Sequence, residues 1–203
     1  MASARFLQLA RRAKKLRQIF LPKNFSPTGV YSPRQLDLVR AYRLLVHAEI
    51  ESYLEDRSRD LVIRATSQFK SDRKPRKVVL NLLSFHSRGK AIDETNLLRI
   101  YASGVEHLDE SIDSAASAYH YSVQHNHGVK QVDIMKLLLP LGFQPATLEA
   151  SFIATLDSFG ANRGEVAHTS IKTQQQIDPK TELDTVSLLI KHLEDIDSGF
   201  NRV

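Results

Sequence analysis

Arg163 and His168, separated by four residues, are the side chains in this sequence best suited to chemistry. Histidine can gain or lose a proton near neutral pH, and arginine offers a fixed charge with paired donors that match phosphate oxygens. Together they suffice for metal-independent cleavage of RNA, with His168 as acid or base and Arg163 stabilising the charge that develops on the phosphate. We expect Asn162 and Glu165 to orient them. The structural alternative is that the pair caps a helix end or holds an interface.

The spacing of this pair limits how the two side chains can meet. Residues five apart on a regular helix differ by about 140° in direction. Either the helix breaks between them, which Gly160 and Gly164 favour, or two chains bring their motifs together around a two-fold axis. The spacing alone leaves both arrangements open.

The segments that must position the motif read as helices. Residues 1–24 form a basic amphipathic arm whose apolar side chains recur every three or four positions, at Phe6, Leu9, Ala13, Leu16 and Phe20. Residues 25–32 form a linker rich in helix breakers. Residues 33–203 form the helical domain, which opens at Ser32-Pro33 with a cap residue followed by proline.

Further apolar patterns continue along the domain. Residues 78–85 fit either a strand or a short helix, because periodicity does not assign a short apolar run. Residues 97–101 and 112–123 read as two helices, the second beginning near Asp109. Helices follow over residues 132–139, over residues 148–159 with Thr147 as the cap, and over residues 183–196. Strong strand alternation is absent from the sequence, so the fold class is all-α, most simply a helical bundle.

The charge of the chain is unevenly distributed. The formal net charge is +5, from 28 basic and 23 acidic residues, and the chain has no cysteine. Seven basic residues and no acidic ones lie in residues 1–24, so 21 basic residues face 23 acidic ones in the remainder. The arm could contact phosphates, lie on an anionic membrane surface, or pack its apolar stripe on a partner protomer. We favour the partner protomer.

Two further groups of residues bear on cofactors and location. His120, His125 and His127 have neither a cysteine nor a clear carboxylate partner, so we expect solvated or capping side chains and no metal or other cofactor. Residues 1–24 carry charges too frequently for a secretory signal, and no apolar run reaches the roughly 20 residues of a membrane span. We therefore expect a cytoplasmic protein without integral membrane association.

Three segments in register carry a family resemblance. They are an early helix of the type L-V-R-A-x-x-x-L-x-H-A-x-I-E-x-Y-L at residues 38–54, an N-H-G step at residues 126–128 that leads to L-G-F at residues 141–143, and R-G-x-x-A-H-T-S at residues 163–170. With these segments the chain resembles the HEPN superfamily, closest to the RiboL-PSP-HEPN branch associated with RNA-ligase and phosphoesterase systems, or a near neighbour. The resemblance covers roughly residues 33–198.

The resemblance implies a fold, an activity and partners. The fold would be a HEPN-like helical bundle, to which this chain adds an N-terminal amphipathic helix. The activity would be that of an endoribonuclease with two copies of the motif in a cleft between homodimer subunits, acting in defence or a toxin-like stress response. Its partners would be RNA and an antitoxin or operon protein. The family pattern also suggests His47 and Glu51 as supporting residues, with Glu51 a buried polar partner of the motif, although a structural carboxylate fits equally.

One departure from the family pattern keeps a second function open. Many active HEPN nucleases have a polar residue, often asparagine, directly after the arginine, whereas this chain has Gly164 there and Asn162 before it. The alternative is a catalytically inactive HEPN-type domain that binds RNA, a nucleotide or a partner protein. A structural dimerisation module is a third interpretation.

Overall fold

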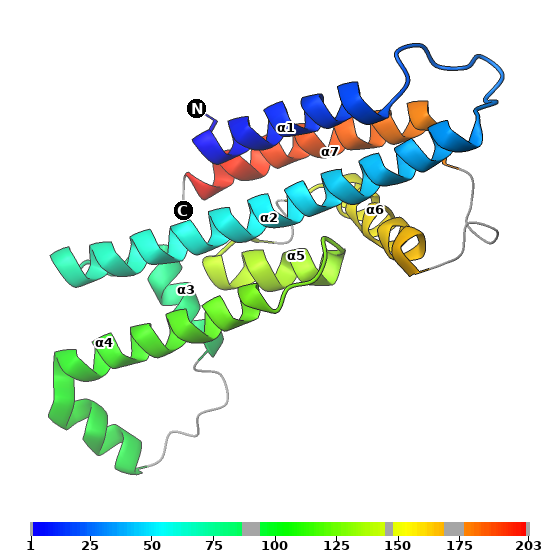
Figure 1. Ribbon diagram of the computed structural model, residues 1–203. Helices are drawn as coiled ribbons and strands as arrows, with labels where there is room; N and C mark the ends of the chain where they lie inside the picture. The colour runs from blue at the N-terminus through cyan, green and yellow to red at the C-terminus, as the bar shows by residue number, and fades with distance from the viewer. Residues whose placement is uncertain (1, 87–93, 145–147, 169–176, 202–203) are drawn as a thin grey trace. The chain divides into compact units, whose positions relative to one another are not determined.

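The computed structural model describes residues 2–86, 94–144, 148–168 and 177–201, and within these ranges it leaves out the side chains of residues 94–107 and 162–168. Its described residues form helices and connecting turns and no strand (Figure 1). The helices are α1 (Ala4–Phe20), α2 (Pro33–Asp72), α3 (Lys77–His86), α4 (Glu94–Gln124), α5 (Gln131–Leu138), the 3-10 turn η1 (Leu139–Leu141), α6 (Ala150–His168) and α7 (Pro179–Phe200). The all-α prediction is confirmed. None of these helices is long and apolar enough to cross a membrane.

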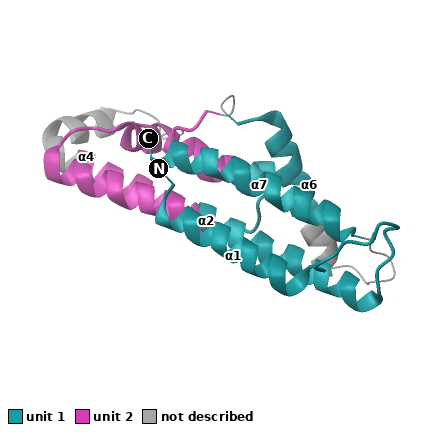
Figure 2. Cartoon of the chain, turned by 90° about the horizontal axis from the view of Figure 1, so that it is seen from above, with its two compact units in different colours: residues 1–54, 127–134, 146–202 teal, residues 55–126, 135–145, 203 magenta. Residues whose placement is uncertain are grey.

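The chain divides into two compact units (Figure 2). Unit 1 contains residues 1–54, 127–134 and 146–202, and unit 2 contains residues 55–126, 135–145 and 203. Helix α2 therefore supplies its first part to unit 1 and its second part to unit 2. Helix α6, which carries the Arg163 to His168 segment, belongs to unit 1 together with α1 and α7.

Helix α1 packs within its own unit. Its buried side chains are Phe6, Leu9, Ala13 and Leu16, and α1 contacts α7. The fully buried carboxylate of Asp197 on α7 accepts hydrogen bonds from the backbone N–H and the hydroxyl of Ser3, both at 2.6 Å. The Tyr53 hydroxyl on α2 donates to the same carboxylate at 3.0 Å. The prediction that the apolar stripe packs on a partner protomer is therefore wrong, because this chain already buries it.

The start of α2 follows the predicted cap. The Ser32 hydroxyl accepts from the Gln35 N–H at 3.3 Å, and the Gln35 side chain accepts from the Ser32 N–H at 2.9 Å. This reciprocal arrangement is a capping box, and Pro33 begins the helix. Further along, Arg12 of α1 donates to Glu49 of α2 at 2.9 Å. The cap sets where α2 begins, and the ion pair joins α2 to α1.

Helix α6 runs without a break to His168. The expectation that Gly160 and Gly164 interrupt it is wrong. Gly160 lies where two segments approach closely, since a Cβ at this position would lie 2.9 Å from the Lys130 side chain. The glycine allows α6 to pass next to the segment before α5 rather than ending the helix.

The structure of unit 2 settles one prediction that was left open and shows another to be wrong. Residues 78–85 lie in helix α3, not in a strand. The two helices predicted over residues 97–101 and 112–123 are parts of one helix, α4. Asp109 does not begin a helix, since it lies inside α4, where its carboxylate accepts from Arg73 at 2.6 Å. Thr147, the predicted cap of the helix over residues 148–159, lies outside the described residues.

Candidate functional site on helix α6

The predicted catalytic segment forms the last turns of α6. Asn162, Arg163, Glu165 and His168 all have helical backbone, and their side chains lie outside the described residues. On a continuous helix, positions five residues apart differ by about 140° in direction around the helix axis. The break between the two residues that the spacing allowed is not found in α6.

His47 and Glu51 lie on α2 within the same unit. The His47 side chain is almost fully buried, and its ring stacks on Phe159 of α6 with 5.9 Å between centroids and 23° between planes. Its Nδ1 lies 3.6 Å from the Glu51 carboxylate one turn along α2. Phe159 precedes Arg163 by one helical turn. The structure therefore brings the two predicted supporting residues together, and His47 contacts α6 one turn before the motif.

A buried ion pair between α2 and α7 was not predicted from the sequence. Arg43 of α2 donates through Nε to Glu182 of α7 at 2.9 Å, and its Nη2 donates to the second carboxylate oxygen. The exposed fractions of the two side chains are 11% and 2%. Burial, reinforced by the nearby Glu182 charge, raises the pKa of the neighbouring Tyr42 above its usual range. An acidic residue in the first turn of a helix usually faces water, so sequence alone gave no signal for this contact.

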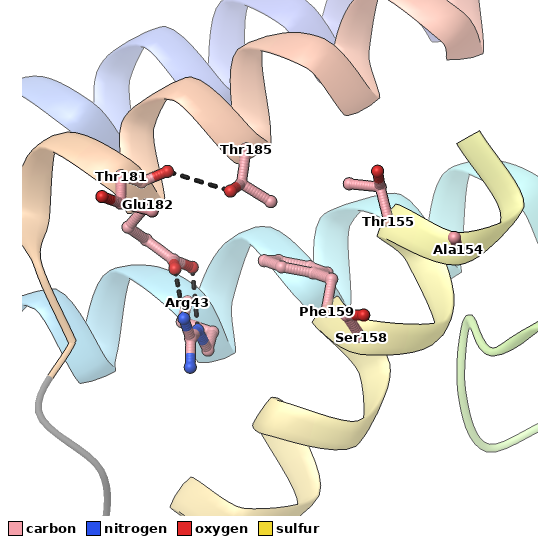
Figure 3. A pocket seen from close by; sticks show the side chains of 8 residues that line it. All are labelled: Arg43, Ala154, Thr155, Ser158, Phe159, Thr181, Glu182 and Thr185. Atoms are coloured by element: carbon pink, nitrogen blue, oxygen red, sulfur yellow. Dashed lines mark hydrogen bonds and ion pairs between the residues drawn. The ribbon is translucent and has the colours of Figure 1, made fainter. Parts of the chain in front are cut away.

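A pocket of about 350 Å³ opens beside this ion pair (Figure 3). Its lining comes from α2, α6 and α7 and consists of Arg43, Ala154, Thr155, Ser158, Phe159, Thr181, Glu182 and Thr185. Phe159 thus contacts His47 and also lines the pocket. The pocket lies on the part of α6 that directly precedes the Arg163 to His168 segment.

The three histidines considered as metal ligands have other surroundings. His125 shares a hydrogen bond of 2.8 Å with the Tyr121 carbonyl, and His127 is exposed. Burial lowers the pKa of His120, with the Arg59 charge as a smaller contribution. Within the described part of the chain, no three histidine, aspartate or glutamate side chains gather in a way that would hold a metal ion.

A family model described as RiboL-PSP-HEPN matches residues 7–201. The chain belongs to this RiboL-PSP-HEPN family. The match extends beyond the 33–198 range of the sequence resemblance and includes most of α1, the helix that packs inside unit 1. No match was found among curated proteins or among solved structures.

The RiboL-PSP-HEPN segment N-H-G, residues 126–128, has a packing role in this structure. A Cβ on Gly128 would lie 2.7 Å from an Asp133 carboxylate oxygen, which accepts from the Lys130 N–H at 3.2 Å at the start of α5. Asp157 of α6 accepts from the Gln131 N–H at 3.2 Å. Gly128 therefore permits the close turn that holds the start of α5 against the motif helix.

Proposed function

We propose that the protein is a metal-independent endoribonuclease whose active site combines Arg163 and His168 from two subunits of a homodimer. The observation that carries this proposal is the continuous α6 helix in a chain of the RiboL-PSP-HEPN family. A helix without a break separates the two side chains in direction, and a two-fold axis is the simplest way to bring an arginine and a histidine to one phosphate.

The chemistry follows from the two residue types. His168 of one subunit accepts the proton of a ribose 2′-hydroxyl, and the freed oxygen attacks the adjacent phosphorus. Arg163 binds two phosphate oxygens and stabilises the charge of the phosphorane. The bond to the 5′-oxygen then breaks, and the second His168 donates a proton to that leaving oxygen. The products are a 2′,3′-cyclic phosphate and a 5′-hydroxyl.

The supporting residues have distinct roles in this proposal. His47 and Glu51 lie 3.6 Å apart on α2, and His47 packs on Phe159 one turn before Arg163. The stacking holds α6 against α2 at Phe159, directly before the motif. Asn162 and Glu165 flank Arg163 and orient the catalytic pair.

The test incubates the purified protein with mixed cellular RNA in EDTA. Wild type should cleave, and Arg163→Ala and His168→Ala should each lower cleavage by about a hundredfold or more, as expected for loss of an acid–base group or a transition-state donor. The matched controls are Arg64→Ala and His125→Ala, because both side chains are exposed on other helices or turns. Equal cleavage by the motif variants and the controls would remove the proposal.

A second candidate function is an inactive HEPN domain that binds RNA, a nucleotide or a protein. Gly164 directly after Arg163 favours it. In that case wild-type protein shifts labelled RNA or captures a partner in EDTA, and the RNA stays intact. Wild-type protein that binds RNA and leaves it intact would therefore support this second function, and cleavage by wild type would exclude it.

For the endoribonuclease, we further propose a cytoplasmic role in defence or toxin-like stress, held in check by an antitoxin or operon partner. Family membership and the RNA-cleaving chemistry of the motif support this role. Induced expression should stop growth for wild type and not for His168→Ala. Equal growth of the two strains, with both proteins expressed, would contradict it.

A further inference from the structure

One face of α1, which runs alongside α7, presents positive charge to solvent (Figure 1). The buried side chains between Phe6 and Leu16 mark the face that the chain itself covers. Because an α-helix turns once every 3.6 residues, the residues on the opposite face recur every three or four positions. Arg11, Lys14 and Lys15 lie at the middle of that opposite face, and all three are exposed. They span about 6 Å along the helix axis, and we call them the basic row.

The charges of the basic row are not compensated within the described part of the chain. Helix α1 contains no acidic residue, and none of the three side chains has an ion pair or a hydrogen bond with any described residue. By contrast, the adjacent Arg12 pairs with Glu49 of α2 at 2.9 Å. Like charges three and four residues apart on a helix repel each other and destabilise it. The row therefore destabilises the free helix, and a polyanion bound to it would relieve that repulsion.

The packing of α1 distinguishes between two kinds of polyanion. A helix that lies on an anionic membrane buries its apolar face in the lipid. In α1 the chain already buries that face, since its side chains are no more than 7% exposed. The two exposed large apolar side chains, Leu7 and Ile19, lie about 18 Å apart along the helix axis and form no continuous patch. Helix α1 thus offers charge without an apolar surface, which suits the phosphates of RNA better than a membrane.

We propose that the basic row binds the sugar–phosphate backbone of RNA without regard to base sequence, and so holds the substrate on the unit that carries the cleavage motif. The inference rests on the proposed nuclease function, which makes RNA the ligand. Helices α1 and α6 belong to the same unit. Arginine binds phosphate oxygens through its planar fork, and lysine binds them as a point charge. Each such contact releases counterions from the RNA, so binding weakens as the salt concentration rises.

The test measures binding to a single-stranded 2′-O-methyl RNA, which lacks the attacking hydroxyl, between about 50 and about 200 mM salt. On a single strand, each phosphate contact contributes about 0.7 to the slope of log affinity against log salt. Replacing the whole row, Arg11→Gln with Lys14→Gln and Lys15→Gln, should therefore lower that slope by about 2. Over this range of salt, wild type should lose about sixteenfold more affinity than the row variant.

The matched control removes three exposed cations that lie on three other helices, namely Arg64 on α2, Lys136 on α5 and Lys191 on α7. The same change to glutamine alters the net charge equally and leaves the basic row intact, so the control should keep the wild-type slope. Glutamine forms helices about as well as arginine and lysine, so both triple variants should keep the wild-type circular dichroism spectrum. Equal slopes for wild type and the row variant, or equal losses in the row variant and the control, would overturn the inference.

The outcomes separate this inference from the nuclease proposal. If wild type leaves cleavable RNA intact, and the row variant alone loses the salt-dependent binding, the basic row stands and the nuclease proposal fails. If wild type cleaves RNA and the row variant keeps its affinity and its slope, the nuclease stands and the basic row fails. Binding of wild type to phosphatidylserine vesicles that the row variant loses, with equal RNA binding by the two proteins, would assign the row to a membrane surface and overturn the inference.

Discussion

The Arg43–Glu182 ion pair gives the sharpest stability prediction. Arg43→Met leaves the Glu182 carboxylate, whose side chain is 2% exposed, without its bidentate partner. Stranding one charge of a buried pair costs about 3–5 kcal/mol of unfolding free energy. Glu182→Leu should cost less, because the 11% exposed Arg43 side chain is longer and can reach water.

The double variant tests the same reasoning from the other side. Arg43→Met with Glu182→Leu removes both charges and puts apolar groups of similar size in their place. Such replacements are often neutral or stabilising, so we expect the double variant to unfold within about 1–2 kcal/mol of wild type. The matched control is Lys180→Met, which breaks an exposed pair with Asp184 on the same helix and should cost less than about 0.5 kcal/mol.

The assay is urea unfolding followed by far-UV circular dichroism, with the slope compared among variants. An unchanged slope assigns a shift in midpoint to stability. The reasoning is refuted if Arg43→Met costs no more than Lys180→Met. It is also refuted if the two single effects simply add in the double variant, since that would mean that the charges do not interact.

Three further predictions concern α1, a histidine and the two-chain site. Leu16→Ala should cost about 2–5 kcal/mol even in dilute monomer, because the chain itself buries this side chain, whereas Leu7→Ala on the exposed face should cost under about 0.5 kcal/mol; equal urea midpoints would contradict the packing of α1. Burial lowers the pKa of His120, so as pH falls below about 6.5 the unfolded chain takes up this proton first and stability declines. His120→Gln should flatten that decline in urea midpoints measured across this range, and an unchanged slope would count against it. Finally, mixed dimers of wild type with His168→Ala keep only one of the two His168 side chains that the composite site uses, so they should cleave RNA about a hundredfold or more slowly than wild type. Mixed dimers with half of the wild-type activity or more would contradict the composite site.

The sequence predicted the helices well where apolar residues repeat and a cap is present. The stripe from Phe6 to Leu16 and the cap at Ser32 are both found as expected. What the stripe contacts was not predictable, because an amphipathic pattern gives a face and not its partner. In the structure α1 contacts α7, where the Asp197 carboxylate accepts hydrogen bonds from Ser3, 194 residues away in the sequence.

The wrong predictions at Gly160 and Asp109 have a common cause, which is that one residue type can occupy more than one kind of position in a helical protein. Glycine breaks helices in isolation, yet Gly160 lies inside α6 because Lys130 passes too close for a side chain. Aspartate caps helices, yet Asp109 lies within α4 and binds Arg73. Only the tertiary neighbours decide between such uses.

The candidate site was predictable in part. The type and spacing of Arg163 and His168 indicated their chemistry, and the family pattern pointed to His47 and Glu51, which the structure brings together. Phe159, at the contact between α2 and α6, carried no signal beyond being apolar. Its role is visible only once the two helices are placed.

The most direct test of the central claim is the chemistry of the cut end. A defined single-stranded RNA containing all four bases is incubated with wild type in EDTA, and the products are identified by mass spectrometry. The account predicts fragments that end in a 2′,3′-cyclic phosphate and begin with a 5′-hydroxyl, and none with His168→Ala. Fragments with a 3′-hydroxyl and a 5′-phosphate, or cleavage that needs an added divalent metal, would contradict it.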